Sequence, residues 1–103
     1  MDENVQDIID AIVRAGNPRS VILFGSRGRG KASPDSDVDI AVLFDHLDRN
    51  PFDMASSLRM QLLDVTNLPI DLLIYDASDF ERRAGHPSSI EHSISTEGRR
   101  AYG

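Results

Sequence analysis

The chain has 103 residues, 40% of them hydrophobic and 27% charged, with a formal net charge of −6 and no cysteine. This length predicts a single domain over residues 1–103, and the lack of cysteine excludes disulfides and thiolate metal sites. The acidic balance argues against direct nucleic-acid binding, which uses basic surface. No segment has the roughly 20 apolar residues of a membrane span, and the acidic N-terminus lacks a signal-peptide core. We therefore expect a cytoplasmic protein outside the membrane.

The first half of the chain predicts one helix and two strands. Apolar residues at helical spacing indicate a helix over residues 3–15, which Gly16 ends. An apolar run predicts a buried strand over Ser20–Phe24. Residues 25–36 are expected to form a glycine-rich loop, with room for one helical turn, and Asp37–Phe44 is expected to be a second strand.

The second half continues the alternation of helices and strands. Asn50 followed by Pro51 is typical of a helix start, and it predicts a helix that turns Met54, Leu58 and Leu62 inward. Further elements are expected over 69–75 (strand), 78–83 (helix), 88–97 (helix, with Ile90 and Ile94 inward) and 99–102 (strand). This alternation indicates an α/β domain with a small mixed sheet.

Two acids mark the start of the second strand. Side chains of alternate strand residues share a face, so Asp37 and Asp39 are expected to point away from the core, with Cα atoms about 6–7 Å apart. Carboxylates that close repel each other unless a proton or a cation relieves them. Mg²⁺ with oxygen ligands is the simplest relief. The alternative is that both acids are merely solvated at the start of a strand.

A third acid interrupts the apolar segment PIDLLIY. Asp71 would be costly in a buried strand without a partner. The helix over 51–64 has a suitable length for a crossover between parallel strands. Asp71 is then expected one strand spacing away from the Asp37 and Asp39 pair.

The loop after the first strand has the residues of a phosphate-binding turn. Gly25 lets backbone N–H groups approach an anion closely, and Ser26 adds a hydroxyl donor. Arg27, Arg29 and Lys31 form a local positive cluster suited to phosphate.

Three other interpretations of this loop remain open. GSRGRGKA nearly matches a P-loop, but Ala32 stands where the magnesium-binding hydroxyl belongs, and Ser33 is one residue out of register. An RNA-binding RG segment fits poorly with a net charge of −6. A mobile basic surface loop is the plain alternative.

Gly25-Ser26, ten further residues and Asp37-x-Asp39 together form a longer motif. With its flanking strands, LFGSRGRGKASPDSDVDIAVLF resembles the signature of the DNA-polymerase-β-like nucleotidyltransferase superfamily, and most closely its small minimal nucleotidyltransferases (MNT). Gly28 stands where many members have alanine, which we interpret as a mild loosening of the loop. PIDLLIYD is similar to the strand with the third acid, and TEGRRAYG to the ending of many members.

The resemblance implies a small mixed sheet backed by helices on one face. It implies that Gly25 and Ser26 hold a nucleoside triphosphate and that Asp37 and Asp39 bind two magnesium ions. Asp71 would help to bind the catalytic metal and prepare the attacking hydroxyl. Arg27 or Arg29 would offset the charge of the leaving group.

Minimal members of this superfamily are often antitoxins of a HEPN-domain ribonuclease toxin, and some transfer AMP from ATP to a tyrosine hydroxyl of that toxin. The alternatives are a non-catalytic antitoxin that acts by contact and an antibiotic-type, small-molecule nucleotidyltransferase that needs a second subunit. The first two strands must be antiparallel neighbours if both touch one triphosphate. Because the acid-bearing face must stay open, we also expect a protein partner or an oligomer.

Overall fold

The computed structural model describes residues 3–31 and 37–103. Ala32 and Ser33, on which the P-loop comparison depends, lie outside these residues. The elements follow in the order α1 (Glu3–Gly16), β1 (Ser20–Phe24), α2 (Gly25–Gly28), β2 (Val38–Phe44), α3 (Pro51–Leu62), β3 (Ile70–Asp76), α4 (Ala77–Ala84), α5 (Ile90–Glu97) and β4 (Arg99–Tyr102).

The strands form one mixed sheet in the order β3-β2-β1-β4. β1 is antiparallel to β2 and to β4, and β2 is parallel to β3 through the α3 crossover. The predicted antiparallel and parallel pairs are both confirmed, as is the α/β class with a small mixed sheet. Asn50 caps α3 by accepting a 2.7 Å hydrogen bond from the Phe52 N–H, so the predicted helix start is also confirmed.

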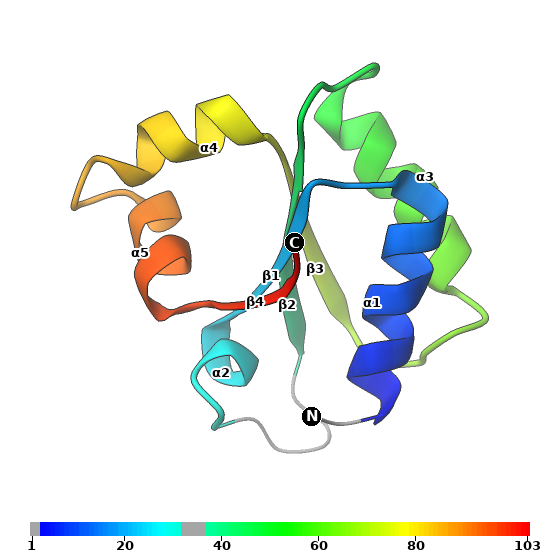
Figure 1. Cartoon of the computed structure of the whole chain (residues 1–103). Helices are drawn as coiled ribbons and strands as arrows, with labels where there is room; N and C mark the ends of the chain where they lie inside the picture. The colour runs from blue at the N-terminus through cyan, green and yellow to red at the C-terminus, as the bar shows by residue number, and fades with distance from the viewer. Residues whose placement is uncertain (1–2, 32–36) are drawn as a thin grey trace.

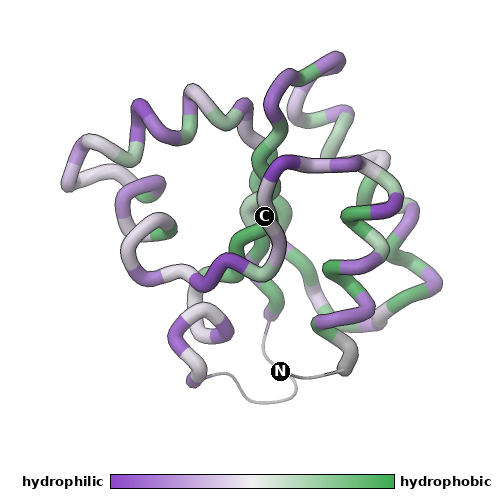
Figure 2. Tube along the Cα trace, in the orientation of Figure 1, coloured by the Kyte–Doolittle hydropathy of each residue, from purple (hydrophilic) through white to green (hydrophobic). Residues whose placement is uncertain are grey.

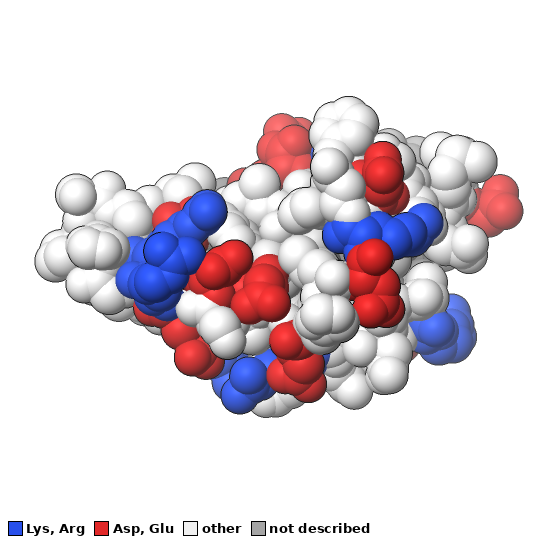
Figure 3. Space-filling view, turned by 90° about the horizontal axis from the view of Figure 1, so that it is seen from above, with Lys and Arg blue, Asp and Glu red and all other residues white. Residues whose placement is uncertain are grey.

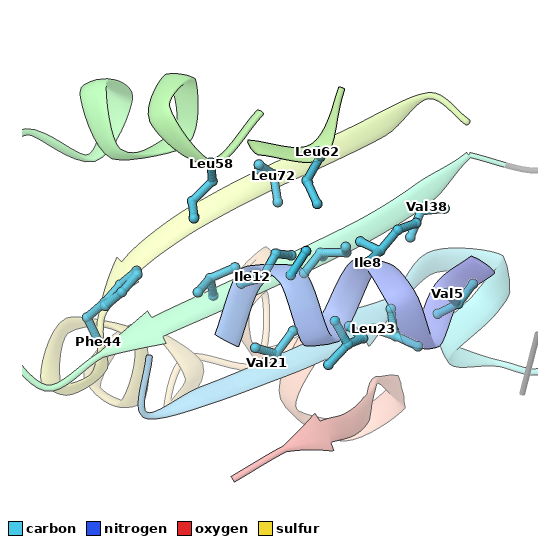
Figure 4. Packing of buried hydrophobic residues seen from close by; sticks show 14 residues of the cluster. Val5, Ile8, Ile12, Val21, Leu23, Val38, Phe44, Leu58, Leu62 and Leu72 are labelled. Carbon is cyan, nitrogen blue, oxygen red and sulfur yellow. The ribbon is translucent and has the colours of Figure 1, made fainter. Parts of the chain in front are cut away.

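One face of the sheet packs against α1 and α3 and forms the larger core (Figures 1 and 4). β2 contributes every second residue to it, and Val38, Ile40 and Val42 are fully buried there. The side of α1 that faces the sheet is apolar and its outer side is polar (Figure 2). This is the 3.6-residue pattern of an amphipathic helix. The strand alternation deduced from the sequence is therefore correct.

Helices also cover the second face, so the expected packing of helices on one face only is wrong. A separate apolar cluster joins Ala41 and Leu43 of β2 to Phe80 of α4 and Ile94 of α5. Figure 1, which views the sheet edge-on, shows α1 and α3 on one side of it and α4 and α5 on the other. These short helices were predicted, but their periodicity does not say which face of the sheet they pack on.

Buried polar contacts hold α4 and α5 in place. The Tyr75 hydroxyl donates a 2.8 Å hydrogen bond to Glu91 Oε2, and Glu91 is only 7% exposed. Tyr75 also packs edge-on against Phe80, with ring centroids 5.0 Å apart. His92 is half-buried, and its Nδ1 lies 2.9 Å from the carbonyl oxygen of Ala84. These contacts fix the two helices over one end of the second face.

One residue that was predicted to face inward lies at the surface. Ile90 was expected inward with Ile94 but is 56% exposed, whereas Ile94 is 2% exposed. Ile90 is the first residue of α5, where the side chain points back beyond the end of the helix. Tyr102 of the edge strand β4 is also partly open to solvent, at 40% exposed. No helix within the described ranges is long and apolar enough to cross a membrane.

Candidate functional site

Asp39 and Asp71 form the centre of the candidate site. They are register partners on the adjacent parallel strands β2 and β3, which lie about 4.8 Å apart. Partial burial raises the pKa of Asp39, and so do its hydrogen bond with Asp71 and the negative charges of Asp71 and Asp37. Two adjacent carboxylates are a donor set that Mg²⁺ takes. The residues present therefore fit a divalent cation.

Asp37 lies at the edge of this pair, directly before β2. It is exposed, and its charge contributes to the raised pKa of Asp39. Within residues 3–31 and 37–103, no three His, Asp or Glu side chains are grouped in an arrangement that holds a metal. The structure brings Asp39 and Asp71 together and places Asp37 nearby. Its role as a third ligand stays a prediction.

Gly25 brings the end of β1 close to these acids. Phe24 is the register partner of Asp39, so Gly25 directly follows the strand at the level of the site. Its φ is +63°, a left-handed conformation that favours glycine. A Cβ built on Gly25 would overlap Asp39 Oδ2 and lie 3.2 Å from Asp39 Cγ. The missing side chain is what allows this backbone to approach the carboxylate.

The serine and the basic residues that follow Gly25 lie in different environments. Ser26 is half-buried, Arg27 is only 8% exposed, and Arg29 is exposed. Lys31 is also exposed, and its N–H donates a 2.9 Å bond to the Ser26 carbonyl. Of the two predicted arginines, Arg29 is therefore the one whose side chain is open to solvent for a phosphate.

Two glycines that sequence reasoning undervalued hold α2 against the sheet. A Cβ on Gly28 would lie 2.7 Å from the carbonyl oxygen of Leu23 and 3.4 Å from the Cα of Gly98. A Cβ on Gly98 would lie 2.8 Å from Ile22 Cγ2. The Gly98 of the TEGRRAYG ending is thus a packing requirement. Gly28 fits a tight contact, and its interpretation as a mild loosening of the loop is wrong.

The end of the molecule opposite to the site has interspersed charges. Figure 3 shows acidic and basic side chains next to one another there. β1 begins and β2 ends on this side, where Arg19 Nη1 lies 3.3 Å from Asp45 Oδ1 in an exposed ion pair. Exposed pairs of this kind contribute little to stability, and the mixed pattern is that of an ordinary solvated surface.

The site is thus a mixed sheet with carboxylates on two adjacent strands, beside a strand that is directly followed by Gly25-Ser26. The sequence model of the family described as "Polymerase beta, Nucleotidyltransferase" matches residues 6–99. The chain belongs to this nucleotidyltransferase family. Among curated proteins, no relative was found.

Solved structures share the fold. A Sulfolobus solfataricus protein assigned as a nucleotidyltransferase superposes with a TM-score of 0.63 at 19% identity, covering 95% of this chain and 76% of that one. A toxin-antitoxin complex with AMP-PNP gives 0.62 at 22% identity, covering 99% and 74%. A mutant of the toxin-antitoxin pair MntA-HpeT gives 0.61 at 22% identity, covering 100% and 74%. At sequence identities this low, the superpositions show a common fold and nothing more.

Proposed function

We propose that this chain is a Mg²⁺-dependent nucleotidyltransferase that transfers a nucleotide monophosphate, AMP from ATP, to a hydroxyl on a partner protein. The observation that carries the proposal is the pairing of Asp39 and Asp71 across β2 and β3, beside the left-handed Gly25. Family membership supports the reaction type. The partner protein would be a toxin, because two structures with this fold are toxin-antitoxin complexes, one of them with AMP-PNP. The resemblance to minimal nucleotidyltransferases implies a toxin of the HEPN type.

In the proposed reaction the acceptor hydroxyl attacks the α-phosphorus of the nucleotide and pyrophosphate leaves. Asp71 is exposed at the start of the edge strand β3, where an acceptor can reach it. Its carboxylate would orient the hydroxyl and accept its proton as the new phosphorus–oxygen bond forms. Asp39, half-buried beside it, would hold the reacting groups in place from the sheet side. Magnesium ions bound by Asp37, Asp39 and Asp71 would supply positive charge that offsets the charge on the phosphoryl oxygens.

The end of β1 would hold the triphosphate. Gly25 has no Cβ, so the backbone after β1 reaches the Asp39 carboxylate, and the N–H groups of this turn would bind phosphate oxygens beside the acids. The Ser26 hydroxyl would donate a hydrogen bond to them, and the exposed Arg29 would offset charge on the departing pyrophosphate. Arg27 is buried and would support the shape of α2. The separation of these roles is testable one residue at a time.

The test uses ATP labelled in its α-phosphate, Mg²⁺ and the protein encoded beside this chain. We expect label on the partner protein with wild type, and a loss of about 100-fold or more with Asp39→Asn or Asp71→Asn. Asp53→Asn is the matched control, because Asp53 is an exposed acid on α3. Label only on a small molecule would reject the protein acceptor. Silencing of the partner by Asp39→Asn protein would show that contact alone is sufficient.

A further inference from the structure

The edge strand beside the candidate acids has open backbone groups. β3 pairs with β2 on one side, and no other strand in the described part of the chain pairs with its other side. The Val38 N–H donates a 2.9 Å bond to the Pro69 carbonyl, and Val38 is the register partner of Ile70. In a parallel ladder this pattern turns the N–H and C=O of Ile70, and of every second residue after it, away from β2. Such groups can pair with an added strand.

An open pocket of about 170 Å³ lies where this edge begins. Its walls come from the end of α3, the loop after it and the first residue of β3, and are lined by Arg59, Leu62, Leu63, Thr66, Leu68 and Ile70. A cavity of about 150 Å³ holds a benzene ring in another protein. The pocket therefore has room for one large apolar side chain.

Neighbouring residues of β3 contribute to the pocket and to the candidate acids. Ile70 forms part of the pocket wall, and Asp71, which follows it, points to the opposite face and pairs with Asp39. On a strand added at this edge, the residue opposite Ile70 would point toward the pocket and its neighbour toward Asp71. The spacing between strands, about 4.8 Å, would bring that neighbouring side chain beside the carboxylate.

We propose that β3 is the docking edge for the acceptor. An extended segment of the partner protein pairs with β3, places an apolar side chain in the pocket beside Ile70 and presents the hydroxyl of the adjacent residue to Asp71. This assignment rests on the proposed transfer to a protein hydroxyl. The charges favour a neutral or basic segment over a second copy of this chain, because Asp71 and Asp76 lie near the two ends of β3 and the chain has a net charge of −6.

Binding is tested with a variant, Asp39→Asn, that is expected not to carry out the transfer. The probe is a neutral to basic peptide of about eight residues, the length of an ordinary strand, with a central tyrosine and a leucine on each side. The control peptide has the same composition, but each leucine stands two positions from the tyrosine. In a strand these leucines lie on the same face as the tyrosine, so neither can enter the pocket while the tyrosine faces Asp71. Fluorescence anisotropy with Asp39→Asn protein should show binding about tenfold tighter for the first peptide. Equal affinities, or no binding of either peptide, would overturn the docking edge.

Two matched substitutions near the two ends of α3 test the pocket. Leu63, which directly follows α3, is on the pocket wall and 67% exposed, whereas Phe52 near the start of α3 is 77% exposed and outside the pocket. Leu63→Asn should weaken binding of the first peptide and raise its KM for transfer by about tenfold, with kcat unchanged. Phe52→Asn should change neither value. Equal effects of the two substitutions would overturn the proposal.

The outcomes separate this proposal from the function on which it rests. The expected binding pattern without any transfer from labelled ATP would reject the transferase function and leave a peptide-binding edge. Transfer to both peptides at equal KM would reject the docking edge and support the function.

Discussion

Gly25 offers the sharpest test of the site, because alanine there would perturb the backbone and the adjacent acid together. The left-handed conformation costs a residue with a Cβ about 1–2 kcal/mol, and the stiffer unfolded chain returns about 0.4–1 kcal/mol. The new Cβ would also overlap Asp39 Oδ2, so the carboxylate must leave its preferred rotamer, at a further cost of about 0.5–1.5 kcal/mol. We expect Gly25→Ala to lose about 2 kcal/mol of unfolding free energy in total.

Gly30 provides the matched control. Its φ is +70°, close to the +63° of Gly25, but nothing lies within 4 Å of a Cβ built on it. Gly30→Ala should therefore show the backbone effect alone, a loss of about 1 kcal/mol. In a chain of this size that corresponds to a fall in Tm of about 4–8 °C. The difference between the two variants measures the contact with Asp39.

Urea denaturation and the labelled-ATP assay report the two effects. Displacing a reacting group by about 1 Å can cost about 100-fold in rate, so Gly25→Ala should lose activity on that scale while Gly30→Ala keeps most of it. In an Asp39→Ala background, Gly25→Ala should cost no more stability than Gly30→Ala. Equal stability and activity of the two single variants would refute the proposed close approach between β1 and the acids.

Three further predictions use the same denaturation assay. Gly28→Ala should lose about 1–3 kcal/mol, since its Cβ would lie 2.7 Å from a β1 carbonyl, and a variant as stable as wild type would contradict this contact. Burial and the contact with Glu91 raise the pKa of Tyr75, so stability should fall as pH rises above about 10, the ordinary pKa of tyrosine. Below that pH, Tyr75→Phe should lose about 1–3 kcal/mol of unfolding free energy. It should also remove this tyrosine's contribution to the fall of stability with pH, and an unchanged pH dependence would contradict the raised pKa of Tyr75. Because burial and Asp71 raise the pKa of Asp39, ionised Asp39 costs stability as pH rises above its unfolded pKa, and Asp39→Asn should gain about 0.5 kcal/mol at pH 7. Added Mg²⁺ should stabilise wild type but not this variant, and equal stabilisation of both would exclude Asp39 as a ligand.

The sheet was predictable from the sequence because its signals are local. Strand alternation alone assigns Val38 and Ile40 to the core and Asp39 to the other face, and the structure agrees. The length of the α3 segment predicts a parallel crossover, which brings Asp71 to the level of Asp39. The pairing of the two acids therefore follows from period and connection length. The metal and nucleotide roles given to them remain predictions.

Contacts between distant segments could not be predicted, since no periodicity encodes them. Gly28 and Gly98 are far apart in the sequence but meet where α2 packs beside the junction of α5 and β4. Each glycine looks like an ordinary turn or helix stop in its own segment. Likewise, burial of Arg27 and exposure of Arg29 depend on how α2 packs on the sheet. Two arginines in one loop give no local signal of that difference.

Coverage of the second face changes the argument for a partner. An acid-bearing face open along its whole length would need another chain to bury it. In the structure α4 and α5 already cover the part of this face that includes Ala41 and Leu43. The exposed Asp71 marks the other end, where β2 and β3 begin. A partner is therefore not needed to complete the core, and under the docking proposal its contacts are confined to the β3 edge.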